Sequence, residues 1–122
     1  MPTQDRVVSI HPYLRVFDGK MDEFKSLCEQ FVSVTAQEPK CLYYGFSFSE
    51  NNVHCREAYE DAEALLVHLT NVEALLNQAL QLSQLTRLEV HGVAEELSKL
   101  TERLSPLAPT YFTLEYGIRR FS

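Results

Sequence analysis

The stretch CLYYGFSFSENNVHCREAYEDAEALLVHLTN (residues 41–71) decides the fold. Its first nine residues, Cys41–Ser49, are rich in aromatic side chains, and this composition favours a pleated strand. Residues 50–52 read Glu-Asn-Asn, and asparagine tolerates the positive φ of a tight reversal, so residues 53–59 are expected to return as the second strand of a hairpin. Asp61 can then cap a helix whose leucines Leu65, Leu66 and Leu69 share one face.

The residues before this stretch predict a strand and a helix. Residues 7–17 (VVSIHPYLRVF) read as a strand in which Pro12 marks an edge, a bulge or a bend, because proline cannot donate to a sheet ladder. A helix is expected over about residues 20–37. Its apolar positions recur at helical spacing: Phe24, Leu27, Cys28, Phe31 and Val34.

The residues after it predict three more elements. The sequence from Thr70 to Glu73 matches a capping box, so the helix is expected to break there and to resume until about Ser83. A short strand is predicted over residues 86–91 and a helix over residues 94–104. The alternation of large apolar and smaller residues over 110–121 indicates a final strand.

This order of elements, β-α-β-β-α-β followed by a helix and a strand, indicates an α+β fold. The core, about residues 7–91, is expected to be a ferredoxin-like antiparallel sheet with helices on one face, in a single domain with a C-terminal extension over about 92–122. Both faces of the predicted strands carry large apolar side chains, so the uncovered face would be a sizeable exposed patch on a monomer. A second copy packed sheet to sheet would cover it, and we therefore expect a homodimer.

Composition excludes several classes of function. The chain of 122 residues carries a net charge of −6, and its basic residues form no cluster larger than Arg119-Arg120, which argues against binding to nucleic acids or to anionic membranes. The N-terminus lacks the apolar segment of a signal peptide, and no run of residues is long and apolar enough for a membrane span. The cysteines match no metal-ligand spacing, so we expect reduced, buried thiols in a cytoplasmic protein: Cys28, Cys41 and Cys55.

Three segments together resemble one protein family. GKMDEF (residues 19–24) resembles the PGK…F start of the first helix in the antibiotic biosynthesis monooxygenase family, and EPKCLYY (38–44) resembles its EPGC…Y segment. EAYED (57–61), followed by AL and HL, is similar to the family's E-x-W-x-D…AL…HL segment. The resemblance covers about residues 7–80 and implies a dimeric α+β barrel. The chain departs from the pattern at Lys40, where the family usually has glycine, and at Tyr59, where tryptophan is commoner.

The resemblance implies a cofactor-independent monooxygenase, or a related enzyme, acting on a small aromatic or phenolic compound without metal or flavin. Such an enzyme binds its substrate in an apolar cavity, assists deprotonation and stabilises the resulting anion. The residues expected to be catalytic are Glu57, Tyr59 and His68. The residues expected to bind substrate are Tyr13, Tyr44, Phe46 and Arg56.

Strand alternation puts Cys55, Glu57 and Tyr59 on one face, and His54 and Arg56 on the other. Because Tyr59 stands where the family has its cavity-lining tryptophan, Glu57 is expected on the cavity side. By the same logic His54 and Arg56 would lie under the helices or at the end of the sheet, where charge is unfavourable, and the sequence does not resolve this conflict.

A structural interpretation of the same residues stays open. Glu57 and Arg56 could form structural hydrogen bonds or an ion pair, the tyrosines could pack in a dimer interface, and His68 could be a structural histidine beside a carboxylate. The protein would then be a non-catalytic homodimeric module that binds a small ligand or assembles. A pocket of several hundred Å3 with converging tyrosine, glutamate or histidine groups would favour the enzyme.

Overall fold

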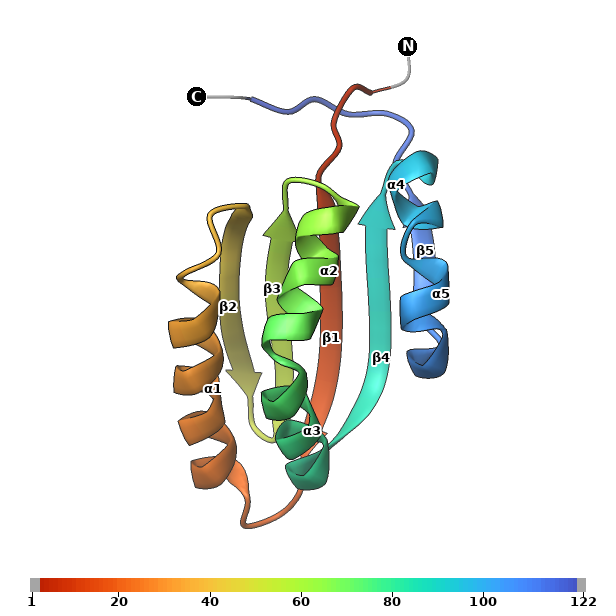
Figure 1. Ribbon diagram of the computed structural model, residues 1–122. Helices are drawn as coiled ribbons and strands as arrows, with labels where there is room; N and C mark the ends of the chain where they lie inside the picture. Colours follow the sequence, from red (N-terminus) through yellow and green to blue (C-terminus); the bar gives the residue numbers. More distant parts are fainter. Residues whose placement is uncertain (1–2, 121–122) are drawn as a thin grey trace.

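One mixed five-stranded sheet forms the back of the molecule in the computed structural model, which describes residues 3–120. The strands run in the order β2-β3-β1-β4-β5 (Figure 1). Their bounds are Val8–Val16 for β1, Cys41–Ser49 for β2, Asn52–Tyr59 for β3, Ser83–Gly92 for β4 and Thr110–Thr113 for β5. The central strand β1 is antiparallel to β3 and β4, and β5 is parallel to β4.

All the helices drawn in Figure 1 lie on the same face of the sheet. Helix α1 lies beside β2, α2 and α3 cross the middle, and α4 and α5 lie beside β4 and β5. Their bounds are Met21–Thr35 for α1, Ala62–Asn71 for α2, Glu73–Leu82 for α3, Ala94–Ser98 for α4, Thr101–Leu104 for α5 and Ser105–Leu107 for the 3-10 turn η1. The predicted α+β, ferredoxin-like fold with helices on one face is thus confirmed. No helix within residues 3–120 is long and apolar enough to cross a membrane.

Pro12 lies in the middle of the central strand, where a proline is unusual. The register between β1 and β4 shifts between Tyr13 and Leu14, one residue further along the strand. Of the three possibilities left open by the sequence, the bulge is the one that occurs. On the other side, the pairing with β3 passes from Ile10 to Tyr13, so Pro12, which has no N–H, lies in a gap of that ladder.

The break between α2 and α3 occurs where the sequence predicts it, but not by the predicted mechanism. Helix α2 ends at Asn71 and α3 begins at Glu73, with Val72 as the shared boundary residue. No side chain caps α3, and the hydroxyl of Thr70 donates instead to the carbonyl of Leu66 within α2. The capping box is therefore wrong, because Thr70 still belongs to the last turn of the preceding helix.

The C-terminal extension differs most from the prediction. The expected helix over residues 94–104 is split into α4 and α5, and the expected strand over 110–121 is regular only over Thr110–Thr113. Apolar residues that continue the alternation leave the sheet: Tyr116 and Ile118 are 82% and 80% exposed. The end of the predicted strand, Phe121, lies outside the described residues. Strand β4 is longer than predicted, since it begins at Ser83 directly after α3.

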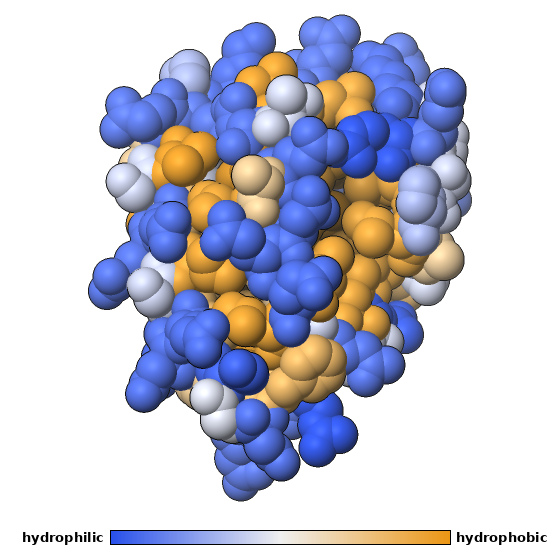
Figure 2. All heavy atoms as spheres, turned by 60° about the horizontal axis from the view of Figure 1, so that its bottom comes forward, coloured by the Kyte–Doolittle hydropathy of each residue, from blue (hydrophilic) through white to orange (hydrophobic). Residues whose placement is uncertain are grey.

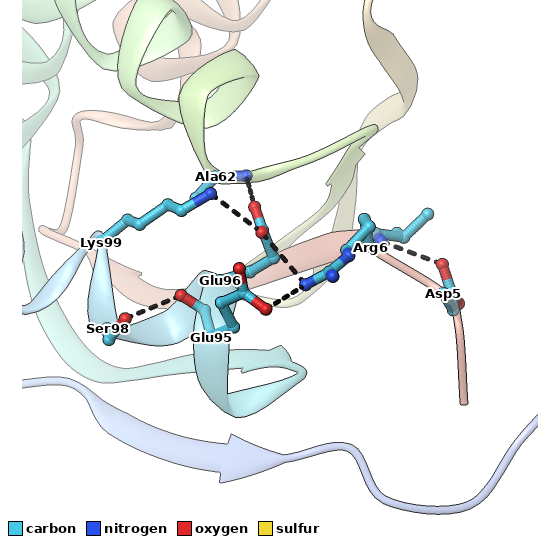
Figure 3. A network of polar contacts seen from close by, with 8 residues as sticks. Asp5, Arg6, Ala62, Glu95, Glu96, Ser98 and Lys99 are labelled. Carbon is cyan, nitrogen blue, oxygen red and sulfur yellow. Dashed lines mark hydrogen bonds and ion pairs between the residues drawn. The ribbon is translucent and has the colours of Figure 1, made fainter. Parts of the chain in front are cut away.

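Glu96 ties this extension to the core, as Figure 3 shows. Its buried carboxylate accepts from the backbone N–H of Ala62 at 3.0 Å and from Lys99 Nζ at 3.0 Å. Arg6 Nη1 lies 3.6 Å from the same carboxylate and 2.9 Å from Glu95. Because Ala62 is the first residue of α2, a side chain from the extension satisfies a free N–H group at the start of that helix and places negative charge at its N-terminus.

The core consists of two apolar clusters side by side under the helices. One cluster lies below α2, α4 and α5 and includes Tyr59, Leu65, Leu97, Leu100 and Leu104. The other lies below α1 and α3 and is described by these members: Val16, Phe24, Phe31, Val53 and Ala79. A cavity is lined by residues from both clusters.

Candidate active site

A small apolar cavity lies between the helices and the sheet, with a volume of about 70 Å3. Its walls come from both core clusters, including Ile10, Leu14, Phe24, Phe31, Phe46, Leu69, Leu76, Leu88 and Leu107. Figure 2, which views the molecule from below and in front, shows hydrophobic side chains gathered in a hollow beside the central helices. The lining also includes three half-buried leucines: Leu76, Leu80 and Leu85.

Four polar side chains also line the cavity: Tyr44, Cys55, Glu57 and His68. Glu57 and His68 are 5% and 2% exposed, so neither is solvated by bulk water. Strand β3 supplies Glu57 and α2 supplies His68. The hairpin and the helix that follow one another in sequence therefore bring an acid and a base together at one end of an apolar cavity.

The polar groups form a continuous chain of contacts. The Tyr59 hydroxyl donates to Glu57 Oε1 at 2.6 Å, and His68 Nε2 lies 3.5 Å from the same oxygen. On the other side of the ring, His68 Nδ1 lies 3.0 Å from Glu38 Oε1 and 3.2 Å from Glu38 Oε2. Asn71 Nδ2 donates to Glu38 Oε2 at 3.0 Å. A histidine thus links two carboxyl groups, one wholly buried and one near the surface.

Burial changes the proton affinity of these groups. It raises the pKa of Glu57 to about 7, and the hydrogen bond from Tyr59 opposes this shift only in part. Burial lowers the pKa of His68, while Glu38 acts in the opposite direction. The pKa values of Tyr44 and Tyr59 are raised well above the ordinary value, mainly by burial, so both phenols stay neutral hydrogen-bond donors. Near neutral pH, Glu57 can therefore both take and give a proton.

The structure places the predicted catalytic residues Glu57, Tyr59 and His68 next to one another. Among the predicted binding residues, Tyr44 and Phe46 line the cavity, where the Tyr44 ring lies 5.2 Å from that of His68. The structure thus brings five of the predicted residues to one place. Their catalytic and binding roles stay predictions.

Tyr13 and Arg56 lie on the other face of the sheet and do not reach the cavity. Tyr13 stacks on His54 with ring centres 4.6 Å apart, and the Arg56 guanidinium lies over the Tyr43 ring at 4.2 Å. The expectation that His54 and Arg56 lie under the helices or at the sheet end is wrong. The helices and the cavity share one side of the sheet, so the face of β3 opposite Glu57 is the uncovered one.

This uncovered face carries a group of histidine and aromatic side chains. The His11 ring lies 4.5 Å from that of His91 and 5.6 Å from that of His54. Exposed Tyr43 and Phe112 flank the histidines on β2 and β5. Within residues 3–120, no group of three or more histidine, cysteine or acidic side chains is arranged to hold a metal ion.

Glu38 is the residue of the site that sequence reasoning missed. In the sequence it is part of the segment EPKCLYY (38–44), just after the first helix. It lies 30 positions from His68 in sequence, and no local spacing connects the two. The only signal was general: a buried histidine needs a partner, and Glu38 is the acidic residue where the first helix ends and the second strand begins.

Comparison with known proteins supports the fold assignment. A candidate antibiotic biosynthesis monooxygenase from Caulobacter crescentus CB15 superposes with a TM-score of 0.64 at 22% identity, over 70% of this chain and 88% of that one. A protein from Chloroflexus aurantiacus J-10-fl of the same description gives a TM-score of 0.59 at 16% identity, over 69% and 89%. The chain thus has the fold of the antibiotic biosynthesis monooxygenase-like proteins.

A nearer relative covers almost the whole chain. MupZ from Pseudomonas fluorescens is 43% identical over 94% of this chain and 95% of its own length, with a TM-score of 0.89. The chain therefore belongs to the same family as MupZ. No family model and no curated protein sequence matches it.

Proposed function

We propose that the protein is a cofactor-independent monooxygenase, or a related proton-transfer enzyme, that acts on a small aromatic or phenolic compound. The observation that supports this proposal most is Glu57. It is a carboxyl group buried in a largely apolar cavity, with its pKa raised to about 7. A general base works best when its pKa lies near the operating pH, and a shifted pKa in a cavity is typical of functional sites.

The arrangement assigns a role to each group. A phenolic hydroxyl at the polar end of the cavity would give its proton to Glu57, while the aromatic ring packs against Phe46 and the aliphatic walls. The resulting electron-rich anion would reduce O2, so that one oxygen atom enters the product and the other leaves as water. Tyr59 would hold Glu57 Oε1 in place through its 2.6 Å hydrogen bond. The substrate supplies the electrons, and the chain supplies position and proton transfer.

One observation favours the alternative, a non-catalytic homodimeric module. The cavity of about 70 Å3 is below the several hundred Å3 typical of ligand pockets, because the chain's own phenylalanines and leucines occupy the space. An aromatic ring can enter only if side chains at the open side, such as Leu76 and Leu80, change position. Binding should therefore be accompanied by movement at α3 and not at the sheet.

An oxygen-uptake assay with a panel of phenols, quinols and anthrones tests the proposal. Wild type should consume O2 with at least one compound, and mass spectrometry should find one added oxygen atom in the product. Glu57→Gln should abolish this, while Tyr43→Phe, on the uncovered face, should not change it. Conversion without O2 uptake that also depends on Glu57 would support a related proton-transfer enzyme. Binding without any conversion would support the module.

We also propose that two copies associate through the uncovered sheet faces and that the protein works in the cytoplasm. In support of the dimer, aromatic side chains such as Tyr43 and Phe112 are 40% and 43% exposed on that face. Such a flat face is suited to contact with its own copy across a twofold axis. In support of the location, Cys28, Cys41 and Cys55 are free thiols, as is usual in a reducing compartment.

A further inference from the structure

We propose that Glu38 is a positioning residue of this site. It fixes His68 in the tautomer whose Nδ1 carries the hydrogen, so that Nε2 faces Glu57 as a proton acceptor. A role of His68 as proton acceptor during turnover rests on the proposed function. The tautomer of His68 does not depend on that function. Nothing in the comparisons with other proteins assigns a role to Glu38.

The contact geometry of Glu38 determines the tautomer. Both of its oxygens lie within hydrogen-bond distance of His68 Nδ1, at 3.0 and 3.2 Å. An ionised carboxylate can only accept, so Nδ1 must donate. In the neutral ring, Nε2 is then left with its lone pair, and it faces Glu57 Oε1 at 3.5 Å.

The backbone around Glu38 holds this carboxylate in place. The Glu38 N–H donates to the carbonyl of Thr35 at the end of α1, and the Glu38 carbonyl accepts from the N–H of Cys41 at the start of β2. Asn71, the last residue of α2, donates to Glu38 Oε2. Three elements therefore fix the carboxylate, and its side chain is 10% exposed against 3% for that of His68.

No other titratable group competes for Nδ1 among those described around the ring. Glu57 and Tyr59 approach His68 from β3, and Tyr44 approaches from β2, with ring centres 5.0 and 5.2 Å from the imidazole for the two tyrosines. Both phenols stay protonated because burial raises their pKa. The carboxylate of Glu38 is thus the group that accepts from Nδ1 of His68 and can balance a positive charge on that side of the ring.

This geometry defines one balanced step. When Glu57 holds a proton taken from the substrate, its O–H bond breaks and an N–H bond forms at His68 Nε2. Glu57 becomes a carboxylate again, and the ring becomes an imidazolium that lies between Glu57 at Nε2 and Glu38 at Nδ1. No electrons are exchanged. The reverse step returns the proton to Glu57 when the product is protonated, so the ring ends the cycle in its starting tautomer.

Histidine NMR on the free protein tests the tautomer without any substrate. In 15N-labelled wild type at pH 8, His68 should show a protonated Nδ1 and an unprotonated Nε2. Glu38→Gln should lower the pKa of His68 by about one unit or more, because a carboxylate within hydrogen-bond distance typically raises a partner's pKa by that much. Glu38→Asp should keep the Nδ1–H tautomer. The matched control Glu60→Gln removes an exposed acid near the end of β3 and should leave the His68 signals unchanged.

A protonated Nε2 in neutral wild type, or unchanged His68 signals in Glu38→Gln, would overturn the proposal. If Glu38→Gln does not fold, Asn71→Ala loosens the carboxylate more gently and should shift the same signals. With a phenol that wild type converts, Glu38→Gln should lower kcat about tenfold with little change in KM, and Glu38→Asp should restore part of the loss. A normal kcat would overturn the role in turnover. If no compound is converted, the proposed function fails, and the NMR result still decides the positioning of His68.

Discussion

Replacing Glu57 by glutamine should raise the free energy of unfolding, relative to wild type, by more at pH 8 than at pH 5. The native pKa of Glu57, about 7, lies above its ordinary value of 4.5. Between these two values the native state keeps a proton that the unfolded chain has released, so wild type loses stability as pH rises through this range. Below pH 4.5 both states are protonated, and well above pH 7 both are ionised, so the loss is confined to the interval between them.

The expected size of this effect follows from the two pKa values. One pH unit of pKa difference corresponds to about 1.4 kcal/mol, which gives about 2 to 3 kcal/mol between pH 5 and pH 8. Glutamine has nearly the same shape and does not ionise, so the variant escapes this loss. Its carbonyl oxygen can still accept from the Tyr59 hydroxyl.

Urea unfolding at pH 5, 6, 7 and 8 measures the difference. The chain contains no tryptophan, so far-UV circular dichroism and tyrosine fluorescence are the suitable signals. Protein concentration must be the same throughout, because association would shift the midpoint. The free energy of unfolding of Glu57→Gln, minus that of wild type, should grow with pH. The exposed control Glu60→Gln should give a difference that does not depend on pH.

A difference between Glu57→Gln and wild type that is constant from pH 5 to pH 8 would refute the reasoning. It would mean that Glu57 has an ordinary pKa, and hence that water reaches it in the native state. A variant that loses stability more at pH 8 than at pH 5 would refute it more strongly. Glu57 would then be an ionised partner in a structural ion pair with His68.

Tyr59, Glu96 and the uncovered sheet face each give a further prediction. Tyr59→Phe should lower the free energy of unfolding by about 1 kcal/mol, and it should lower turnover of an accepted phenol about 100-fold. A loss of stability with unchanged turnover would indicate a structural role. Glu96→Ala should destabilise by about 1 to 3 kcal/mol in urea unfolding, since the N–H of Ala62 loses its acceptor in a buried place. Sedimentation equilibrium at micromolar concentration should give about twice the chain mass of 14.0 kDa, and a clean monomer would contradict the sheet-to-sheet dimer.

The elements that the sequence predicts well are those with strong local periodicity. The hairpin over residues 41–59 and the start of α2 behind Asp61 are confirmed, and Asp61 caps the N–H of Ala64 at 2.9 Å. Glu57 and Tyr59 could be grouped because strand alternation acts over two residues. His68 could be assigned to the same site because it belongs to the AL…HL part of the segment that resembles the family.

The features that the sequence could not predict depend on distant contacts. Nothing local connects Glu38 to His68, and strand alternation alone does not say which face of β3 the helices cover. The pattern over residues 110–121 alternates as in a strand, yet only Thr110–Thr113 pairs with β4. At an edge, the length of pairing is decided by the neighbouring strand, which ends at Gly92.

The contact between Glu96 and the first turn of α2 has a consequence for the order in which the molecule is completed during synthesis. The helix that carries His68 is made before the segment that supplies Glu96 and the cavity-lining Leu107. At about 5 to 20 residues per second, the ribosome needs on the order of seconds to add that segment. During this interval the nascent chain has the hairpin and α2 but an open end at Ala62 and an incomplete cavity. The cavity should therefore be completed only after the segment that carries Glu96 and Leu107 has been made, so a chain truncated before Glu96 should have less protected amide hydrogens in α2 than the full chain.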